Sequence, residues 1–368
     1  MKISNIDLDN IIERFNDPEG KIALGIDGYI DSVWHIIASK DSNDDYVFYN
    51  KMRNFSQTLM ACEDGGFANE IISKRRAFGG FTAHTAEAIV GLGVETSMLG
   101  MFGKEAIDPA FNIFSGVKEI VSIGDPALAV IYEFNDGKLM LLHVEELMSL
   151  TWKRLTDTVG EPLLKEFYSN ADIIGLGYWS LMPAFDDIVS KICEYVKDNK
   201  KTKRLFLDFA DIRKRDKSAL DQSLAHLKNL NNQLPITLSL NENEGELMFS
   251  YFGETFVMNK EEGSVAQTEK VREAIGLDEL VVHTPYFAVA SSATEGSCSM
   301  TQNHCSSPLI TAGAGDNFSG GYLAASLKGL PLAERLFVAN AVTYLYVSRG
   351  KSPTREEFFE EITLQATR

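Results

Sequence analysis

The most informative stretch of the chain reads Leu309-Ile-Thr-Ala-Gly-Ala-Gly-Asp-Asn-Phe-Ser-Gly-Gly-Tyr-Leu-Ala-Ala-Ser-Leu-Lys328. Gly313, Ala314 and Gly315 have almost no side chain, and apolar residues recur after them at helical spacing. Glycine permits a tight turn and lets a ligand approach the backbone closely. A helix that begins at such a turn points unpaired N–H groups toward it, and these groups bind anions. The stretch therefore predicts an anion-binding turn followed by a helix.

Asp316 stands at the start of this predicted helix, where its carboxylate has two interpretations. An acid beside an anion site can take the proton from a hydroxyl group that attacks a phosphoryl group. Aspartate is also a favoured N-cap, so the same residue can serve only to cap the glycine turn. Local chemistry leaves both interpretations open.

The motif around Asp316 resembles the C-terminal motif of the ribokinase-like (PfkB) sugar and nucleoside kinases. The matching residues are Thr311, Ala312, Gly313, Ala314, Gly315, Asp316, Phe318, Gly320 and Gly321. The resemblance implies that the backbone of residues 313–315 forms an anion hole and that Asp316 is the catalytic base. The family motif usually begins with aspartate, whereas this chain has Ile310.

The composition is that of a globular protein with a sizeable core. The chain has 368 residues, of which 45% are hydrophobic and 24% charged, and its net charge is −17. Because no long run of Lys or Arg interrupts this negative charge, nucleic acid and anionic membranes are poor partners for its surface. The N-terminus lacks an apolar signal core and no apolar run reaches membrane-spanning length, so we expect a cytoplasmic location. The four cysteines lack C-x-x-C spacing, which favours free thiols.

Predicted strands and helices alternate between residues 20 and 350, which indicates an α/β fold with a mostly parallel sheet and helices on both faces. Residues 21–26 read as the first buried strand, and residues 150–168 as one helix. The resemblance implies a single ribokinase-like domain over residues 1–368, built as a three-layer α/β/α sandwich with a small β-sheet lid. We expect the lid to contain residues 28–50 and 127–143 and to exclude water from the reaction.

Two carboxylates, Asp27 and Asp31, follow the first predicted strand. Ligands of open α/β sheets gather at the carboxyl ends of the strands, which places these acids near a pocket. The resemblance implies a sugar-binding aspartate shortly after this strand, and we favour Asp31 over Asp27 for that role. A turn-capping role is equally compatible with Asp27.

Paired glycines, Gly79 and Gly80, precede an amphipathic run that ends at Gly93, as expected for a helix with glycine at its C-terminal end. This run resembles the N-terminal motif of the ribokinase-like kinases, in which Gly-Gly and a following asparagine contact the sugar. His84 occupies the place of that asparagine. Because both side chains exchange hydrogen bonds with hydroxyl groups, His84 is a candidate sugar ligand, with a structural role as the alternative.

Asn241 and Glu244 follow another predicted strand and resemble the family's Asn-x-x-Glu motif, which positions Mg²⁺ and the nucleotide phosphates through water. Mg²⁺ keeps most of its waters and needs few direct carboxylate ligands, which suits this pair. The alternative is a capping box, with Asn241 as N-cap and Glu244 three residues later. The two roles are compatible, because phosphates also bind at a helix N-terminus.

The resemblance alone assigns three further residues to the nucleotide: Thr284, Thr311 and Asn340. The family usually has Thr-x-Gly at the first of these positions, whereas Pro285 follows Thr284 here. The aspartates and arginine that end the segment 204–213 resemble residues on the phosphate side of the family's site. A structural salt bridge is the alternative for them.

We therefore interpret the chain as an ATP- and Mg²⁺-dependent kinase that phosphorylates a hydroxyl group of a sugar or a related small molecule. A nucleoside kinase of the same fold is the nearest alternative. A sugar-binding relative without kinase activity is a third, because the sequence departs from the family motifs at Ile310, Pro285, His84 and Lys104. Analogy with the family adds a homodimer formed through the lid and room for a monovalent cation.

Overall fold

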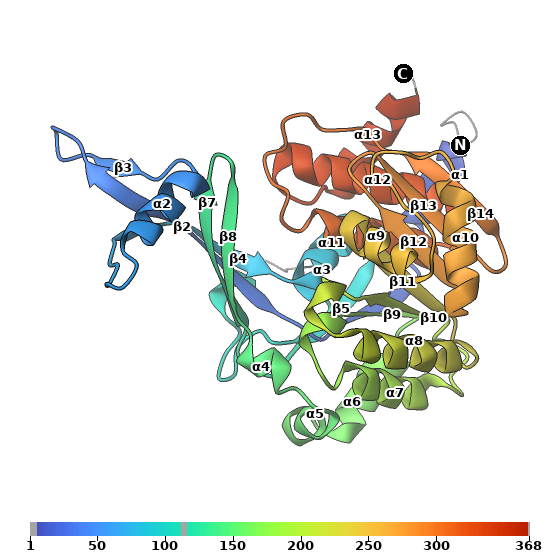
Figure 1. Cartoon of the computed structure of the whole chain (residues 1–368). Coiled ribbons are helices and arrows are strands. Elements are labelled where there is room, and N and C mark those ends of the chain that lie inside the picture. The colour runs from blue at the N-terminus through green and yellow to red at the C-terminus, as the bar shows by residue number, and fades with distance from the viewer. Residues whose placement is uncertain (1–5, 112–115, 367–368) are drawn as a thin grey trace.

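The computed structural model describes residues 6–111 and 116–366. A nine-stranded sheet forms its centre, with the strand order β14-β13-β12-β11-β10-β9-β1-β5-β6 (Figure 1). Neighbouring strands pair in parallel, except that β13 runs antiparallel to both β12 and β14. The strands span Lys21–Gly25 (β1), Glu95–Gly100 (β5), Glu119–Ser122 (β6), Ile173–Gly177 (β9), Arg204–Asp208 (β10), Ile236–Asn241 (β11), Glu279–His283 (β12), Phe287–Ser292 (β13) and Gly296–Thr301 (β14).

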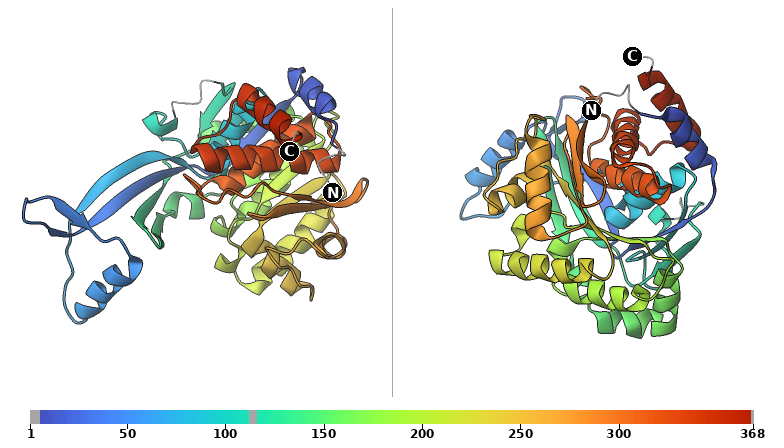
Figure 2. Two further views of the ribbon diagram at one scale, coloured as in Figure 1. Left: turned by 90° about the horizontal axis from the view of Figure 1, so that it is seen from above. Right: turned by 90° about the vertical axis from the view of Figure 1, so that its right-hand side faces the viewer.

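Helices cover both faces of this sheet. Central strands such as β9 and β12 are therefore buried along their whole length. One face carries Trp152–Val159 (α5), Glu161–Ser169 (α6), Phe185–Val196 (α7), Lys217–Asn231 (α8), Glu242–Tyr251 (α9) and Ser264–Ile275 (α10). The other carries Leu8–Asn16 (α1), Phe81–Gly91 (α3), Ala314–Leu327 (α11), Leu332–Arg349 (α12) and Arg355–Ala366 (α13). The three layers are visible in Figure 2 and confirm the predicted α/β/α sandwich.

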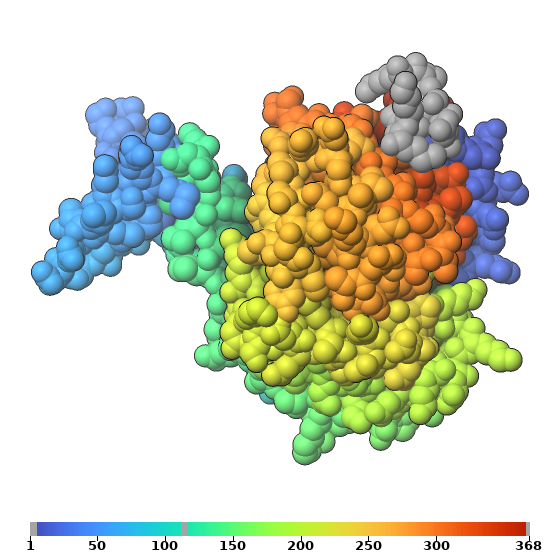
Figure 3. Space-filling view, turned by 45° about the vertical axis from the view of Figure 1, so that its right-hand side comes forward, coloured from blue at the N-terminus to red at the C-terminus, as the bar shows by residue number. Residues whose placement is uncertain are grey.

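A second, five-stranded sheet projects from one side of this body and forms the lid. Its strands are Tyr29–Lys40 (β2), Tyr46–Phe48 (β3), Ile71–Gly79 (β4), Ala127–Phe134 (β7) and Gly137–His143 (β8), with the helix Met52–Ala61 (α2) following β3. Within it, β4 pairs antiparallel with β2 and β7 pairs parallel with β2. Figure 3 shows the outer part of the lid as a lobe that stands apart from the body. Since β4 lies outside residues 28–50 and 127–143, the lid sheet contains more of the chain than the sequence indicated.

The other predicted elements hold with one correction. Residues 21–26 form β1 and the residue after it, as predicted, but the single helix predicted over residues 150–168 is wrong. Gly160 has a φ of +85° and separates α5 from α6, because this conformation does not continue a helix. The remaining short helices are Glu145–Met148 (α4), Pro109–Phe111 (η2), Trp179–Leu181 (η3) and Ile212–Lys214 (η4).

Two simpler expectations can also be compared with the structure. All four cysteines are free, as the sequence predicted. Within the described residues, none of the helices combines the length and the apolar character needed to cross a membrane.

A buried ionic network joins β11 and β12 of the main sheet to α11 and α12. The carboxylate of Glu279 is fully buried and accepts hydrogen bonds from Arg335 (2.7 Å) and from the hydroxyl group of Tyr322 (2.7 Å). It also accepts a bond from the hydroxyl group of Thr237 (2.9 Å), while Arg335 pairs in addition with Glu295. Removing one member of this network would leave a buried charge without its partner, which is strongly destabilising. The fold therefore depends on all of these residues being present together.

Candidate active site

The predicted glycine turn lies where α11 begins. Gly313 is the N-cap residue of this helix and has a φ of +81°. A Cβ atom on Gly313 would lie 2.8 Å from the hydroxyl oxygen of Tyr346 and 2.9 Å from the ring of His84. Glycine is therefore required here both for its backbone conformation and for the space it leaves.

Two backbone N–H groups of this turn are available to an anion. Within the part of the chain that the structure describes, the amides of Gly315 and Asp316 have no backbone acceptor, as is usual in the first turn of a helix. Ala314, which the sequence assigned to the anion hole, instead donates its N–H to the carbonyl of Thr311 (3.2 Å). The free donors are thus centred one residue further along the helix than predicted.

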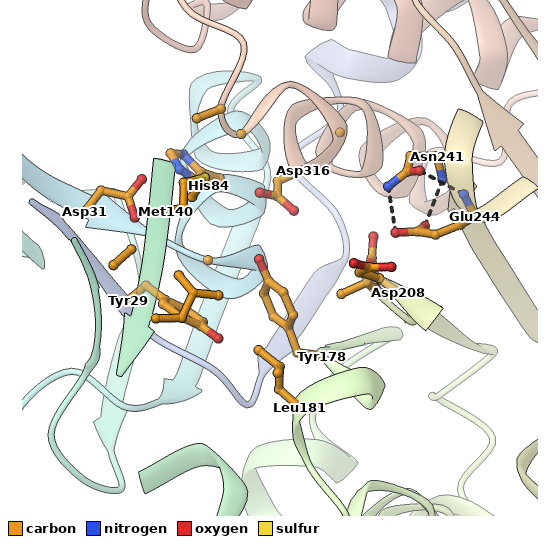
Figure 4. A pocket seen from close by; sticks show the side chains of 18 of the residues that line it. Tyr29, Asp31, His84, Met140, Tyr178, Leu181, Asp208, Asn241, Glu244 and Asp316 are labelled. Carbon is orange, nitrogen blue, oxygen red and sulfur yellow. Dashed lines mark hydrogen bonds between the residues drawn. The ribbon is translucent and has the colours of Figure 1, made fainter. Parts of the chain in front are cut away.

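The Asp316 carboxylate faces the central cavity (Figure 4). It makes no hydrogen bond with the described residues, and Gly313 rather than Asp316 is the N-cap, so the capping interpretation fails. Burial raises the pKa of Asp316 well above its usual range, and the negative charges of Asp208, Asp27 and Asp31 add to this. A carboxylate with a raised pKa is a stronger base.

The cavity has a volume of about 500 Å³ and lies between the lid and the carboxyl ends of the body strands. The lid side includes Tyr29, Asp31 and Met140, and the body side includes Tyr178, Asp208, Asn241, Glu244 and Asp316 (Figure 4). This volume is within the range of small-molecule sites. A ligand can therefore reach Asp316 both from the lid side and from the strand ends.

The two candidate acids after β1 have different surroundings. Asp27 is fully buried, and its Oδ1 accepts hydrogen bonds from the N–H (2.9 Å) and the hydroxyl group of Thr82, in the first turn of α3. Asp31 lies on β2 and lines the cavity, where burial raises its pKa to about 6. Asp27 therefore binds the first turn of α3 rather than capping a turn of its own, and Asp31 faces the cavity.

Gly79 and Gly80 bring these two acids close to the backbone. A Cβ atom on Gly79 would lie 2.4 Å from Oδ1 of Asp31, and one on Gly80 would lie 2.1 Å from Oδ2 of Asp27. Gly80 also lines the cavity. The paired glycines therefore set the positions of both carboxylates.

His84 is buried on α3 between the rings of Phe78 and Tyr346, at centroid distances of 5.1 Å and 6.2 Å. Burial lowers the pKa of His84 to about 4, so its ring is neutral near pH 7. It lines the cavity, and its Nδ1 has no hydrogen-bond partner in residues 6–111 and 116–366. A neutral imidazole with an unused nitrogen can exchange a hydrogen bond with a hydroxyl group.

Asn241 and Glu244 form the predicted capping box at the start of α9. The Asn241 side chain accepts from the Glu244 N–H (3.1 Å), and Glu244 accepts from the Asn241 N–H (2.9 Å). Burial raises the pKa of Glu244 well above its usual range, and Asp208 raises it further. Asp208 and Glu244 face each other in Figure 4. Two such acids are both stably ionised only when a cation is near.

The donor set at this end of the cavity suits a water-separated magnesium ion. Among the described residues, no three His, Cys, Asp or Glu side chains are grouped closely enough to hold a metal directly. Mg²⁺ does not need such a group, because it usually keeps several waters and takes only one or two carboxylates from the protein. Asp208, Glu244 and the Asn241 amide supply oxygen atoms of the kind it prefers.

The three residues assigned to the nucleotide by resemblance are not brought together at the cavity. The hydroxyl group of Thr284 donates to the carbonyl of Phe287 (3.0 Å) and accepts from its N–H (3.1 Å). The Asn340 amide donates to the carbonyl of Met300 (3.2 Å), and its Oδ1 is unpaired within the described residues. Thr311 lines a neighbouring cavity. Their assignment to the nucleotide stays a prediction.

Several cavity residues were not assigned to the site by the sequence, among them Tyr178, Lys214 and His283, whereas Asp208 had been placed on the phosphate side by resemblance alone. Asp208 and His283 end β10 and β12, and Tyr178 directly follows β9. The ring of His283 stacks on Phe318 (4.6 Å), and burial lowers the pKa of His283 to about 4. The strand ends are the signal that could have identified Tyr178 and His283, because ligands gather there; Lys214 lies on η4 and had no such signal.

Comparison with known proteins identifies the family of the chain. The sequence matches the prokaryotic ketohexokinase family over residues 8–363. It is 28% identical, over 344 residues, to a ketohexokinase from Haloferax volcanii; the match covers 92% of this chain and 89% of that protein.

Solved structures show the same fold. The Arabidopsis thaliana ribokinase complexed with ribose and ATP has a TM-score of 0.66 and 17% identity, and the match covers 94% of this chain and 99% of that one. A nucleoside kinase from Methanocaldococcus jannaschii has a TM-score of 0.59 and 16% identity, with the same coverage of 94% and 99%. The chain therefore has the ribokinase-like fold and belongs to the prokaryotic ketohexokinase family of PfkB-type carbohydrate kinases.

Proposed function

We propose that this protein transfers the γ-phosphoryl group of ATP to a hydroxyl group of a ketohexose such as fructose, with Asp316 as the general base. The observation that carries the proposal is the unbonded carboxylate of Asp316 in the same helical turn as the free amides of Gly315 and Asp316. The carboxylate accepts the hydroxyl proton, and the amides stabilise charge on the transferred group. Because both lie on α11, their spacing is fixed by the helix.

The sugar is held on the lid side of the cavity. Asp31 accepts hydrogen bonds from sugar hydroxyl groups, and the neutral ring of His84 exchanges one more. Gly80 supplies the backbone against which the sugar packs. The sugar then lies between Asp31 and Asp316, so one hydroxyl group faces the base.

The nucleotide phosphates take the opposite side, at the strand ends. Glu244 and Asp208 would hold Mg²⁺ through water, and the ion when bound neutralises phosphate charge. Lys214, which also lines this cavity, adds a cation of the protein itself. ATP as the donor is supported by the ribokinase of the same fold that was solved with ribose and ATP.

The lid also supports the expected homodimer. Its outer part exposes apolar side chains, including Tyr46 (50%), Leu59 (41%) and Met60 (74%). Exposed apolar surface of this kind marks interaction sites. Light scattering after size exclusion tests this part, and a monomeric mass would contradict it.

A substrate panel tests the proposed function. ADP release is measured with fructose, aldohexoses, pentoses and nucleosides as acceptors, and we expect the highest kcat/KM with the ketohexose. Nucleoside turnover without sugar turnover would favour a nucleoside kinase instead. Calorimetric binding of fructose without ATP binding or ADP release would indicate a sugar-binding relative that does not phosphorylate.

Replacing Asp31 should weaken sugar binding rather than folding. Charge-assisted hydrogen bonds contribute roughly 1.5–3 kcal/mol, so Asp31→Asn should raise KM for fructose by about 10- to 100-fold while KM for ATP stays nearly constant. The matched variant is Asp27→Asn, which weakens the capping of α3 and should lower the thermal midpoint instead. An unchanged fructose KM in the first variant would remove Asp31 from the sugar site.

The pH profile should move when Asp208 is replaced. Asp316 must be ionised to accept a proton, so kcat/KM falls as the pH drops below its raised pKa. Asp208 is the charged neighbour that raises this pKa most, so Asp208→Asn should shift the acidic limb to lower pH. Profiles of kcat/KM between about pH 5 and pH 9 measure the shift.

The control for this experiment is Asp211→Asn. Asp211 also lines the cavity, but its carboxylate is already bound by Arg213 (2.7 Å) and lies outside the charges that raise the Asp316 pKa. This variant should leave the acidic limb in place. A shift to higher pH in Asp208→Asn would contradict the assignment of Asp316 as the titrating base.

A further inference from the structure

A second cavity continues from the sugar side of the central one. Its volume is about 370 Å³, and it lies between the lid and the segment of residues 308–312. Lys138 lines both cavities. A smaller cavity of about 120 Å³ connects Arg75 with Asp31 and His84. Asp31 therefore lines both the central cavity and this smaller one, which also contains Arg75.

Arg75 lies on the same face of the lid as Asp31. Side chains two residues apart on a strand share a face. Asp31 pairs with Ala77 of β4, and Val33 pairs with Arg75. Arg75 is thus displaced from Asp31 by one step along the lid, about 7 Å.

Lys138 reaches the same space from the other edge of the lid. Ala129 of β7 pairs with Asp31 on one side and with Leu142 of β8 on the other. Lys138 is four residues from Leu142, so it shares this face and lies beyond Asp31 in the same direction as Arg75. Two cations from different strands therefore converge on the second cavity.

Neither of these two side chains makes a hydrogen bond or an ion pair with the described residues. The cations next to Arg75 in the sequence differ: Lys74 pairs with Glu133 (2.5 Å), and Arg76 binds Asp108 through two bonds (2.9 and 2.6 Å). Lys74 and Glu133 both line the second cavity and neutralise each other. Among the described residues of the cavity wall, Arg75 and Lys138 therefore remain as two positive charges without a paired carboxylate. This is a local reversal in a chain whose net charge is −17.

The carboxylate of Asp31 does not form an ion pair with either cation. Both cations act on its carboxylate from a distance, but within residues 6–111 and 116–366 neither approaches it within the 4.0 Å of an ion pair. An arginine fork and a lysine ammonium together offer many donors and no acceptor, which suits the oxygen atoms of a phosphate. The pair is thus free to bind an anion in the cavity.

We propose that the second cavity is a phosphate subsite, which binds the phosphate group of a ketohexose phosphate whose sugar occupies the lid side of the central cavity. The proposal rests on the proposed function, because it takes Asp31 and His84 as the groups that hold the sugar. A ketohexose phosphate then binds more tightly than the neutral ketohexose, since Arg75 and Lys138 contact its phosphate group. A free phosphate ion has the same chemistry, so the experiment separates the two sources.

The experiment is calorimetry on the full chain without nucleotide. Fructose, fructose 6-phosphate and inorganic phosphate are titrated into the wild type, Arg75→Gln, Lys138→Gln and the control Arg76→Gln. We expect fructose 6-phosphate to bind about 10- to 100-fold more tightly than fructose. Arg75→Gln and Lys138→Gln should each weaken its binding by roughly tenfold and change fructose affinity by less than about threefold.

The control and the competing outcomes are separable. The guanidinium of Arg76 is already bound by Asp108, so Arg76→Gln should leave fructose and fructose 6-phosphate affinities unchanged. Equal affinities for the two sugars in the wild type, or tight binding of the phosphate that survives both substitutions, would overturn the proposal. Inorganic phosphate that binds as tightly as fructose 6-phosphate, with the same dependence on Arg75, would assign the cavity to a free anion instead.

ADP release from fructose in the same preparations tests the proposed function on its own. Normal fructose turnover with no preference for the phosphate would reject only the subsite. Absence of turnover with any sugar, together with binding that depends on Arg75, would reject only the kinase assignment.

Discussion

Replacing Asp316 by asparagine should lower kcat for sugar phosphorylation by about 10²–10⁴-fold, the usual contribution of a positioned general base. Asparagine keeps the shape of the side chain but cannot accept the hydroxyl proton. The Asp316 carboxylate makes no hydrogen bond with the described residues, so the substitution breaks no structural contact. It also removes one of several like charges from a buried cluster, so we expect no loss of stability.

Three measurements decide this prediction. Steady-state ADP release gives kcat, thermal unfolding reports the fold, and calorimetry reports fructose binding. Asp211→Asn serves as the control, because it removes another cavity carboxylate that Arg213 already binds, and it should lower kcat far less. If Asp316→Asn kept a kcat within about tenfold of the wild type, the general-base role would have to be abandoned.

Replacing Arg335 by methionine should lower the free energy of unfolding by about 3–5 kcal/mol, the cost of leaving a buried charge without its partner. Glu279 is fully buried, and its remaining cation, Arg204, is 3.7 Å away rather than 2.7 Å. Tyr322 of α11 belongs to this network, but Asp316 and the free amides at the start of α11 do not. The urea midpoint measures the effect, and residual activity at low temperature checks that the fold is retained.

Two comparisons isolate the buried charge as the cause. Adding Glu279→Gln to Arg335→Met removes the uncompensated carboxylate and should recover a large part of the loss. Lys153→Met breaks an exposed pair with Asp157 and should cost less than about 1 kcal/mol. A loss below that value for Arg335→Met would mean that the network contributes little to stability.

The parts of the site that depend on neighbouring residues could be predicted from the sequence. Gly313, Gly315 and Asp316 lie within four positions, so a turn, a helix start and an acid could be inferred together. The capping box of Asn241 and Glu244 is equally local, and the structure confirms it. Such features depend on backbone geometry over a few residues, which composition and spacing determine well.

Features that depend on distant residues could not be derived in this way. Asp208 raises the pKa of Asp316 although 108 positions separate them, because β10 and the start of α11 meet only in the folded chain. The break at Gly160 was missed because the apolar spacing continues across it and one glycine is tolerated in many helices. The engagement of the Ala314 amide with Thr311 also depends on the detailed path of the turn.

The lid shows the same limit most clearly. Its strand pairing determines that Arg75 and Lys138 share a face with Asp31, and no local pattern specifies that pairing. A register shift between Val33 and Trp34 further alters which residues of β4 lie opposite β2. Since a shift of one residue moves side chains to the other face, charges on the lid cannot be located from sequence alone.

The lid and the body carry different halves of the chemistry. Asp31 lies on β2, whereas Asp316 and its free amides lie on α11. Exchanging the lid strands between relatives should therefore redirect the enzyme toward other acceptors while the transfer step stays intact. Such a modular layout would let related enzymes evolve different acceptor specificities while they keep the same transfer step.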